Sequence, residues 1–149
     1  MFERLWKTQP HSGRLWMKRC LLLAAVYNMA FGLWAIFWPS SAFDLVGMTR
    51  PNYPELWQCI GMIVGVYGLG YGIAAFDPLR HWPIVLVGFL GKIFGPIGFL
   101  QALIKGSLPV VFGGILVTND LIWWLPFGAI VLAAWRAYQV HMQAAENRA

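Results

Sequence analysis

Long runs of hydrophobic residues, separated by short polar segments, dominate the sequence. Three such runs of about twenty residues cover residues 20–38, 55–76 and 83–104, and a fourth apolar stretch covers residues 108–140. A helix of about 20 apolar residues is long enough to cross the hydrocarbon core of a bilayer. The pattern therefore predicts an all-α fold: an integral membrane four-helix transmembrane bundle.

Polar residues and prolines mark the ends of the predicted spans. Residues 39–54 form a loop, in which Ser40 or Ser41 could cap a short surface helix that reaches Leu45. Pro54 and Glu55 are typical of a helix start, with proline at the first helical position and an acid in the first turn. Residues 77–83 form a turn so tight that the second and third spans must be antiparallel neighbours.

The last apolar run is too long for one membrane helix. A single helix over residues 108–140 would extend about 50 Å, whereas the hydrocarbon core is about 30 Å thick. A break is expected at Gly113 and Gly114 or at Asn119 and Asp120. We therefore predict a short outer or re-entrant segment over residues 109–117 and a fourth span over residues 119–138. Asn119 or Asp120 would be the N-cap of that span.

Composition and charge support a membrane location. The 149-residue chain is 59% hydrophobic and 11% charged, whereas about 25% charged residues are usual in soluble domains. Its net charge is +5, but five of its eleven Lys and Arg residues precede the first span, where they suit an anionic inner leaflet better than a nucleic acid. We expect a basic arm on the membrane surface over residues 1–19, a membrane domain over 20–140 and a tail over 141–149.

The placement of basic residues also predicts the orientation. The N-terminal arm, the 77–83 turn and the C-terminal end of the chain from Arg136 onward hold eight of them, while each of the two opposite loops holds one. Cytoplasmic loops carry an excess of Lys and Arg. Both termini are therefore expected on the cytoplasmic side of a bacterial inner membrane.

Glycines recur on one face of the second span and on one face of the third. Small residues at this spacing let two helix backbones approach closely, which matters because lipid provides no hydrophobic drive between helices. We therefore expect the second and third spans to pack through glycines. The residues concerned are Gly61, Gly65, Gly68 and Gly72, and Gly88, Gly91, Gly95 and Gly98.

Lys92 lies near the middle of the third span, where an ammonium group costs about 2.5–3.5 kcal/mol on insertion scales. Pro96 has no N–H to donate to the carbonyl of Lys92, so a free backbone acceptor adjoins the cation. Asp120, Asn28 and Tyr27 are candidate partners. Lys92 either makes a structural ion pair or hydrogen bond to another span, or it contacts an anion, a lipid headgroup or a transferred proton. The sequence leaves both interpretations open.

Three other polar residues lie toward the outer ends of the second and third spans: Glu55, Gln58 and Gln101. Together with Asp120 they could line an outward-facing pocket roofed by Trp57, Trp123 and Trp124, or they are only polar residues at the level of the lipid headgroups. The complete set of ligand-binding candidates is Lys92, Asp120, Asn28, Asn119, Glu55, Gln58, Gln101, Trp123 and Trp124.

The sequence contains no nucleophile motif, metal-binding helix motif or paired-carboxylate signature, and the three histidines lie in separate segments. We therefore expect no cofactor and no metal. In size and four-span topology the chain resembles small bacterial four-helix membrane proteins such as the DoxX-like group. This resemblance implies a membrane-bundle fold and assigns no functional residues.

The function expected from these observations is non-catalytic: an accessory subunit, or a binder of a lipid- or quinone-like ligand. One alternative is an intramembrane enzyme acting on a lipid or isoprenoid, with Asp120 or Glu55 as proton donor. The other is a small oligomeric transporter. The expected partners are the lipid bilayer and a lipid-like ligand, with a homo-oligomer or a larger membrane complex left open, and no nucleic acid.

Overall fold

The computed structural model describes residues 11–146, within which every regular element is helical. Four long helices have the length and apolar composition of membrane spans, the last together with the short helices before it. They are α2 (His11–Phe37), α4 (Pro54–Phe76), α5 (Trp82–Ile104) and α7 (Trp124–Glu146). The short elements are α3 (Ser41–Leu45), η1 (Val110–Phe112), α6 (Gly113–Asn119) and η2 (Leu121–Trp123).

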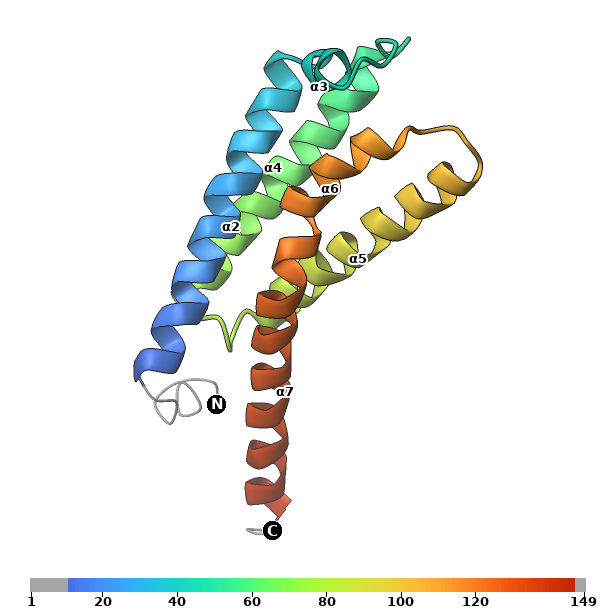
Figure 1. Cartoon of the computed structure of the whole chain (residues 1–149). Helices are drawn as coiled ribbons and strands as arrows, with labels where there is room; N and C mark the ends of the chain where they lie inside the picture. The colour runs from blue at the N-terminus through green and yellow to red at the C-terminus, as the bar shows by residue number, and fades with distance from the viewer. Residues whose placement is uncertain (1–10, 147–149) are drawn as a thin grey trace.

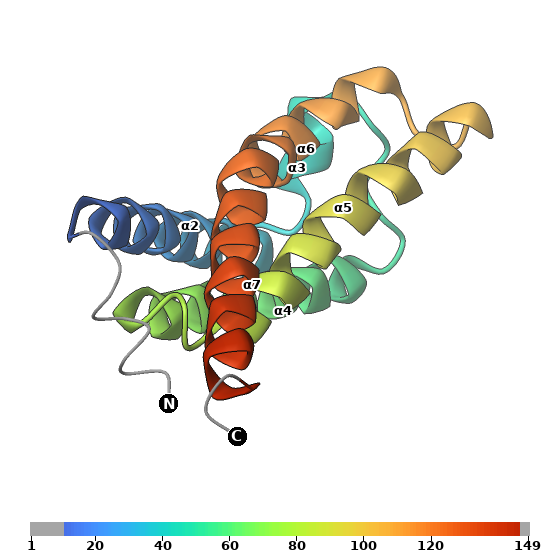
Figure 2. The same cartoon turned by 90° about the horizontal axis from the view of Figure 1, so that it is seen from below.

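The long helices do not form a symmetric bundle. α2 and α4 lie side by side along their length, whereas α5 diverges from α4 toward the end where it connects to α6 (Figure 1). α2 and α5 lie on opposite sides of α7 (Figure 2). The start of α2, the α4–α5 turn and the end of α7 lie toward one end of the molecule, and α3 lies at the other (Figure 1).

The first long helix begins before the predicted start of the first span. α2 begins at His11, so residues 11–19 of the expected surface arm are helical and continuous with the apolar part of α2, while residues 1–10 lie outside the described part of the chain. Lys, Arg, Met and Leu are good helix formers, and they carry the helix without a break through residues 14–19. Met17 is buried in the core, which anchors this extension against the rest of the bundle.

The last apolar run is broken, as its length predicts. α6 ends at Asn119, Asp120 has φ −122° and ψ −60°, and the 3-10 turn η2 leads into α7. The predicted capping role is wrong, because the Asp120 side chain makes no cap hydrogen bond at η2 and Asn119 Oδ1 accepts none among the described residues. The Asp120 carboxylate instead accepts a 2.9 Å hydrogen bond from Asn119 Nδ2.

The glycines of α4 pack mainly against α2, so the predicted glycine-to-glycine interface between the second and third spans is wrong. A Cβ on Gly61 would lie 2.8 Å from the carbonyl oxygen of Gly32, and one on Gly68 would lie 3.0 Å from the carbonyl oxygen of Ala25. The periodicity identified a close-packing face but not its partner. α2 can take that place because it offers small residues, Ala25 and Gly32, at the points of contact.

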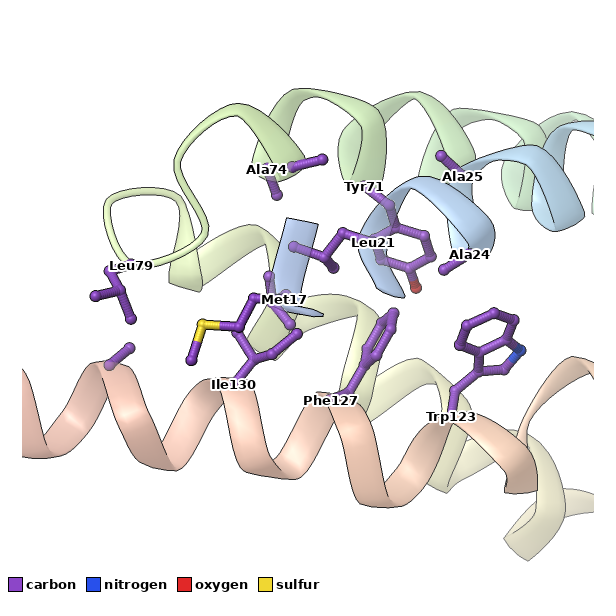
Figure 3. Packing of buried hydrophobic residues seen from close by; sticks show 13 residues of the cluster. Met17, Leu21, Ala24, Ala25, Tyr71, Ala74, Leu79, Trp123, Phe127 and Ile130 are labelled. Carbon is purple, nitrogen blue, oxygen red and sulfur yellow. The ribbon is translucent and has the colours of Figure 1, made fainter. Parts of the chain in front are cut away.

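The buried core joins α2, α4 and α7 near the α4–α5 turn (Figure 3). Leu21, Phe127 and Ile130 are fully buried there. The Phe127 ring meets the Tyr71 ring edge-on, with centroids 5.0 Å apart. This packing places Tyr71 and Trp123 at the border between the core and a group of buried polar residues.

Candidate functional site

Lys92 lies inside the protein, with only 3% of its surface exposed. Its ammonium donates a 2.5 Å hydrogen bond to the carbonyl oxygen of Asn119, and it lies 5.8 Å from the ring centroids of both Tyr71 and Trp123. Aromatic faces attract a desolvated cation. Neighbouring helices and the Asn119 carbonyl therefore shelter this charge.

Lys92 and Asp120 face the same cavity without forming a direct ion pair. Among the described residues the close ion pair is between Arg50 and Asp44, at 2.8 Å. The Asp120 carboxylate is oriented toward α5, where a Cβ on Gly95 would lie 3.2 Å from its Oδ2. The two charges are therefore neighbours across a small space, and each has its own hydrogen-bond partner.

This cavity is enclosed by Asp120 and by four helices: α2, α4, α5 and α6. Its volume is about 120 Å³. It is lined by Asn28, Ile63, Val64, Tyr67, Tyr71, Gly88, Gly91, Lys92, Asn119 and Asp120. The structure thus brings together the sequence candidates Lys92, Asp120, Asn28 and Asn119, which come from segments far apart in the chain.

Two amide oxygens at the cavity lack a protein partner. Asn28 is only 2% exposed, and its Oδ1 accepts no hydrogen bond within the described part of the protein. The Oδ1 of Asn119 is likewise buried and accepts no hydrogen bond from the described residues. A buried acceptor without a donor costs about 1–3 kcal/mol, so the cavity is suited to a polar guest.

The glycines of α5 make room for polar side chains. A Cβ on Gly88 would collide with the Tyr71 hydroxyl, and one on Gly91 would come within 3.9 Å of the Tyr67 hydroxyl. A Cβ on Gly95 would lie 3.2 Å from Asp120 Oδ2. Gly88 and Gly95 therefore leave space for Tyr71 and Asp120, whereas a Cβ at Gly91 would make only an ordinary van der Waals contact.

A larger apolar groove runs between α4 and α5 beside the cavity. Its volume is about 690 Å³. It is lined by Met62, Ile63, Val66, Tyr67, Gly70, Pro83, Ile84 and Val87. Ile63 and Tyr67 line both spaces, so the groove and the polar cavity adjoin.

The two candidate tryptophans support the site from outside the cavity. Trp123 lies against the Lys92 ammonium, and its Nε1 donates a 3.1 Å hydrogen bond to the carbonyl oxygen of Thr118. Trp124 Nε1 donates to the carbonyl oxygen of Lys92 at 2.9 Å. The hydroxyl of Tyr27, a candidate partner of Lys92, donates instead to Thr118 Oγ1 at 3.0 Å.

The remaining candidates do not join the site. Glu55 and Gln101 are exposed, and Gln58 Nε2 donates a 2.8 Å hydrogen bond to the carbonyl oxygen of Ile36. Trp57 packs against Phe43, with ring centroids 5.3 Å apart. The outward-facing pocket does not form because α4 begins beside α2 and α3, whereas α5 ends far from them (Figure 1).

Sequence reasoning missed Tyr67, Tyr71 and Thr118. The two tyrosines lie four residues apart, so they share one face of α4 and point at the same neighbour. That spacing inside an apolar span is a signal that could have identified them. Thr118 has no comparable signal, because its role depends on the break between α6 and η2.

No protein-family model, curated protein or solved structure matches this chain. The fold is that of a helical protein with four apolar segments long enough to cross a membrane.

Proposed function

We propose that this chain is a non-catalytic multi-pass protein of the bacterial inner membrane that binds a lipid- or quinone-like amphiphile. The polar head of the ligand would occupy the Lys92 cavity, and its apolar chain would lie in the groove between α4 and α5. The observation that supports this proposal best is that the two spaces adjoin, with Ile63 and Tyr67 lining both.

The two spaces would contribute differently to binding. Acyl chains in a bilayer are already out of water, so the groove provides shape complementarity and little hydrophobic free energy. The head would gain more, because each hydrogen bond made in an apolar surrounding replaces an unpaired acceptor or donor. The cavity residues are therefore expected to determine which polar head is bound. The groove is expected to determine where the apolar chain of the ligand lies.

The proposed orientation places the start of α2, the α4–α5 turn and the end of α7 in the cytoplasm. Exposed basic residues at this end support it: Lys18, Arg19, Arg80 and Arg136. At the opposite end the charge of Arg50 is offset by Asp44. This distribution follows the excess of Lys and Arg in cytoplasmic loops.

A binder is preferred to an intramembrane enzyme because the site has few candidate catalytic groups. Of the two proposed proton donors, Asp120 lines the cavity, whereas Glu55 lies exposed at the start of α4. No described cavity residue is a thiol or an imidazole, and the Asp120 carboxylate already accepts a hydrogen bond from Asn119.

The test is analysis of the amphiphiles that co-purify with the protein in mild detergent, by native mass spectrometry and lipid extraction. We expect one class of amphiphile at close to one molecule per chain. Val87→Trp should reduce it about tenfold or more, because the indole would fill the groove from α5. Val26→Trp is the matched control, since Val26 is an exposed residue of α2 that does not line the groove.

Two results would contradict the proposal. One is a monodisperse protein with no amphiphile bound above the level of detergent-solubilised bulk lipid. The other is equal retention of the amphiphile by the Val87→Trp and Val26→Trp variants.

A further inference from the structure

The geometry points to an uncharged hydroxyl as the head that this cavity selects, in preference to phosphate, carboxylate, ammonium or a head that only accepts hydrogen bonds. This inference rests on the proposed amphiphile-binding function and specifies its ligand as a long-chain alcohol, in the broad sense of a hydroxyl on an apolar chain.

The unpaired groups in the cavity require a donor. Asn28 Oδ1 and Asn119 Oδ1 are buried acceptors without partners among the described residues. A ligand that offers an O–H or N–H would satisfy one of them, whereas an ether or carbonyl oxygen has no hydrogen to donate. The buried amide of Asn28 therefore favours hydroxyl heads over purely accepting heads.

The charges in the cavity exclude charged donors and acceptors. A ligand ammonium would be placed beside the Lys92 ammonium, in a site from which water is largely excluded, and like charges repel strongly there. A phosphate or carboxylate would meet Asp120, which offsets the charge of Lys92 in the same cavity. Burying a head that adds one net charge to the cavity is costly, so a neutral head is favoured.

The cavity also offers a donor to a hydroxyl oxygen. A lysine ammonium has three N–H donors, and the one that bonds the Asn119 carbonyl leaves two for other partners. A hydroxyl is both a donor and an acceptor, so it matches the unpaired oxygen of Asn28 and the free N–H groups of Lys92, two residues that line the same cavity. The volume of about 120 Å³ suits a small head of this kind.

The experiment uses photo-crosslinking to the full-length protein in nanodiscs. The probe is a sixteen-carbon alcohol with a diazirine and an alkyne in its chain. Competitors of equal chain length carry a hydroxyl, a methyl ether, a carboxylate, a phosphate or an amine. We expect the probe to label peptides from residues 62–70 and 83–87, which line the groove. The alcohol should compete about 3–10-fold better than the ether, the effect of one hydrogen bond to a neutral group.

Asn28→Ala tests the proposed acceptor, because it removes the amide while keeping the Cβ that packs near Gly68. In this variant the alcohol and the ether should compete equally. Asn52→Ala, an exposed change in the α3–α4 loop, should leave the preference intact. Unlabelled isoprenoid alcohols and alkyl hydroquinones, each tested against its own methyl ether, distinguish the sources of the hydroxyl.

The inference is overturned if labelling of the groove is competed equally by alcohol and ether, or best by a charged head. It is also overturned if Asn28→Ala leaves the alcohol preference unchanged. Either result would leave amphiphile binding itself in place. If no probe labels the groove peptides, the proposed function fails as well. If the Asn28→Ala variant does not fold, the comparison of alcohol with ether in the unmodified protein still tests the inference.

Discussion

The indole Nε1 of Trp124, the first residue of α7, donates a hydrogen bond to the backbone carbonyl of Lys92 in the middle of α5. That carbonyl is free because Pro96, four residues later in the helix, has no N–H. The Lys92 ammonium meanwhile bonds the carbonyl of Asn119, the last residue of α6. One residue of α5 therefore holds both sides of the break that separates α6 from α7.

Trp124→Phe is expected to destabilise the fold by about 1–2 kcal/mol, because the Lys92 carbonyl loses its donor. Pro96→Ala restores a backbone N–H in α5 that can donate a hydrogen bond to the Lys92 carbonyl. The double variant should therefore recover much of the loss, and a double-mutant cycle from unfolding in mixed micelles would measure the coupling.

Trp135→Phe is the matched control for that cycle, since Trp135 is an exposed tryptophan further along α7. It should change stability little and show no coupling to Pro96→Ala. Additive effects of Trp124→Phe and Pro96→Ala would contradict the assignment of this hydrogen bond.

Lys92→Met is expected to destabilise the folded protein by a few kcal/mol. Removing one member of a buried charged pair typically costs about 3–5 kcal/mol, and the separation of Lys92 from Asp120 places this variant toward the lower end. Asp120→Asn in the same chain should restore part of the stability, because it removes the uncompensated carboxylate. Thermal unfolding of the single and double variants in one detergent would measure both effects.

Lys105→Met provides the comparison, because Lys105 is exposed in the connection after α5. Its stability should be close to that of the unmodified protein. If Lys92→Met were equally benign, Lys92 would have no structural role in holding α5 to α6.

Gly61→Ala and Gly65→Ala should differ although both lie on the same face of α4. A Cβ at Gly61 would lie 2.8 Å from both Ala35 Cβ and the Gly32 carbonyl oxygen, whereas a Cβ at Gly65 meets nothing within 4 Å. Alanine favours a helix over glycine by about 1 kcal/mol at either position. Overpacking costs typically about 1–3 kcal/mol, so Gly61→Ala should be less stable than Gly65→Ala by that amount. Equal stabilities would mean that α2 and α4 can separate freely.

Asp44 and Arg50 make a pH-dependent contact outside the four long apolar helices. Hydrogen bonds from the Arg50 guanidinium lower the pKa of Asp44 below its ordinary value. A lowered pKa in the folded state contributes stability above the unfolded pKa, and this is lost as the pH falls through the folded value. Because the pair is fully exposed, the effect on stability should be small. Arg50→Gln should raise the Asp44 pKa in a carboxyl NMR titration, and Lys105→Gln should not.

The sequence alone determined the apolar helices, the need for a break in the last apolar run at either Gly113 and Gly114 or Asn119 and Asp120, and the cost of leaving Lys92 unsheltered. Each follows from one-dimensional information. Span length is read from the apolar runs, a thirty-three-residue run exceeds the bilayer thickness, and a lysine at mid-span must be sheltered. Periodicity likewise placed the glycines of α4 and α5 on single faces.

Only the tertiary structure decided which faces meet. Gly61 and Gly68 contact α2, while Gly88 and Gly95 leave room for Tyr71 and Asp120. A helical period defines the direction of a side chain from its own axis, but the partner depends on how the helices cross. For the same reason Glu55 of α4 and Gln101 of α5 lie apart, because α5 diverges from α4 toward its C-terminal end, whereas Asn28 of α2 reaches the Lys92 cavity.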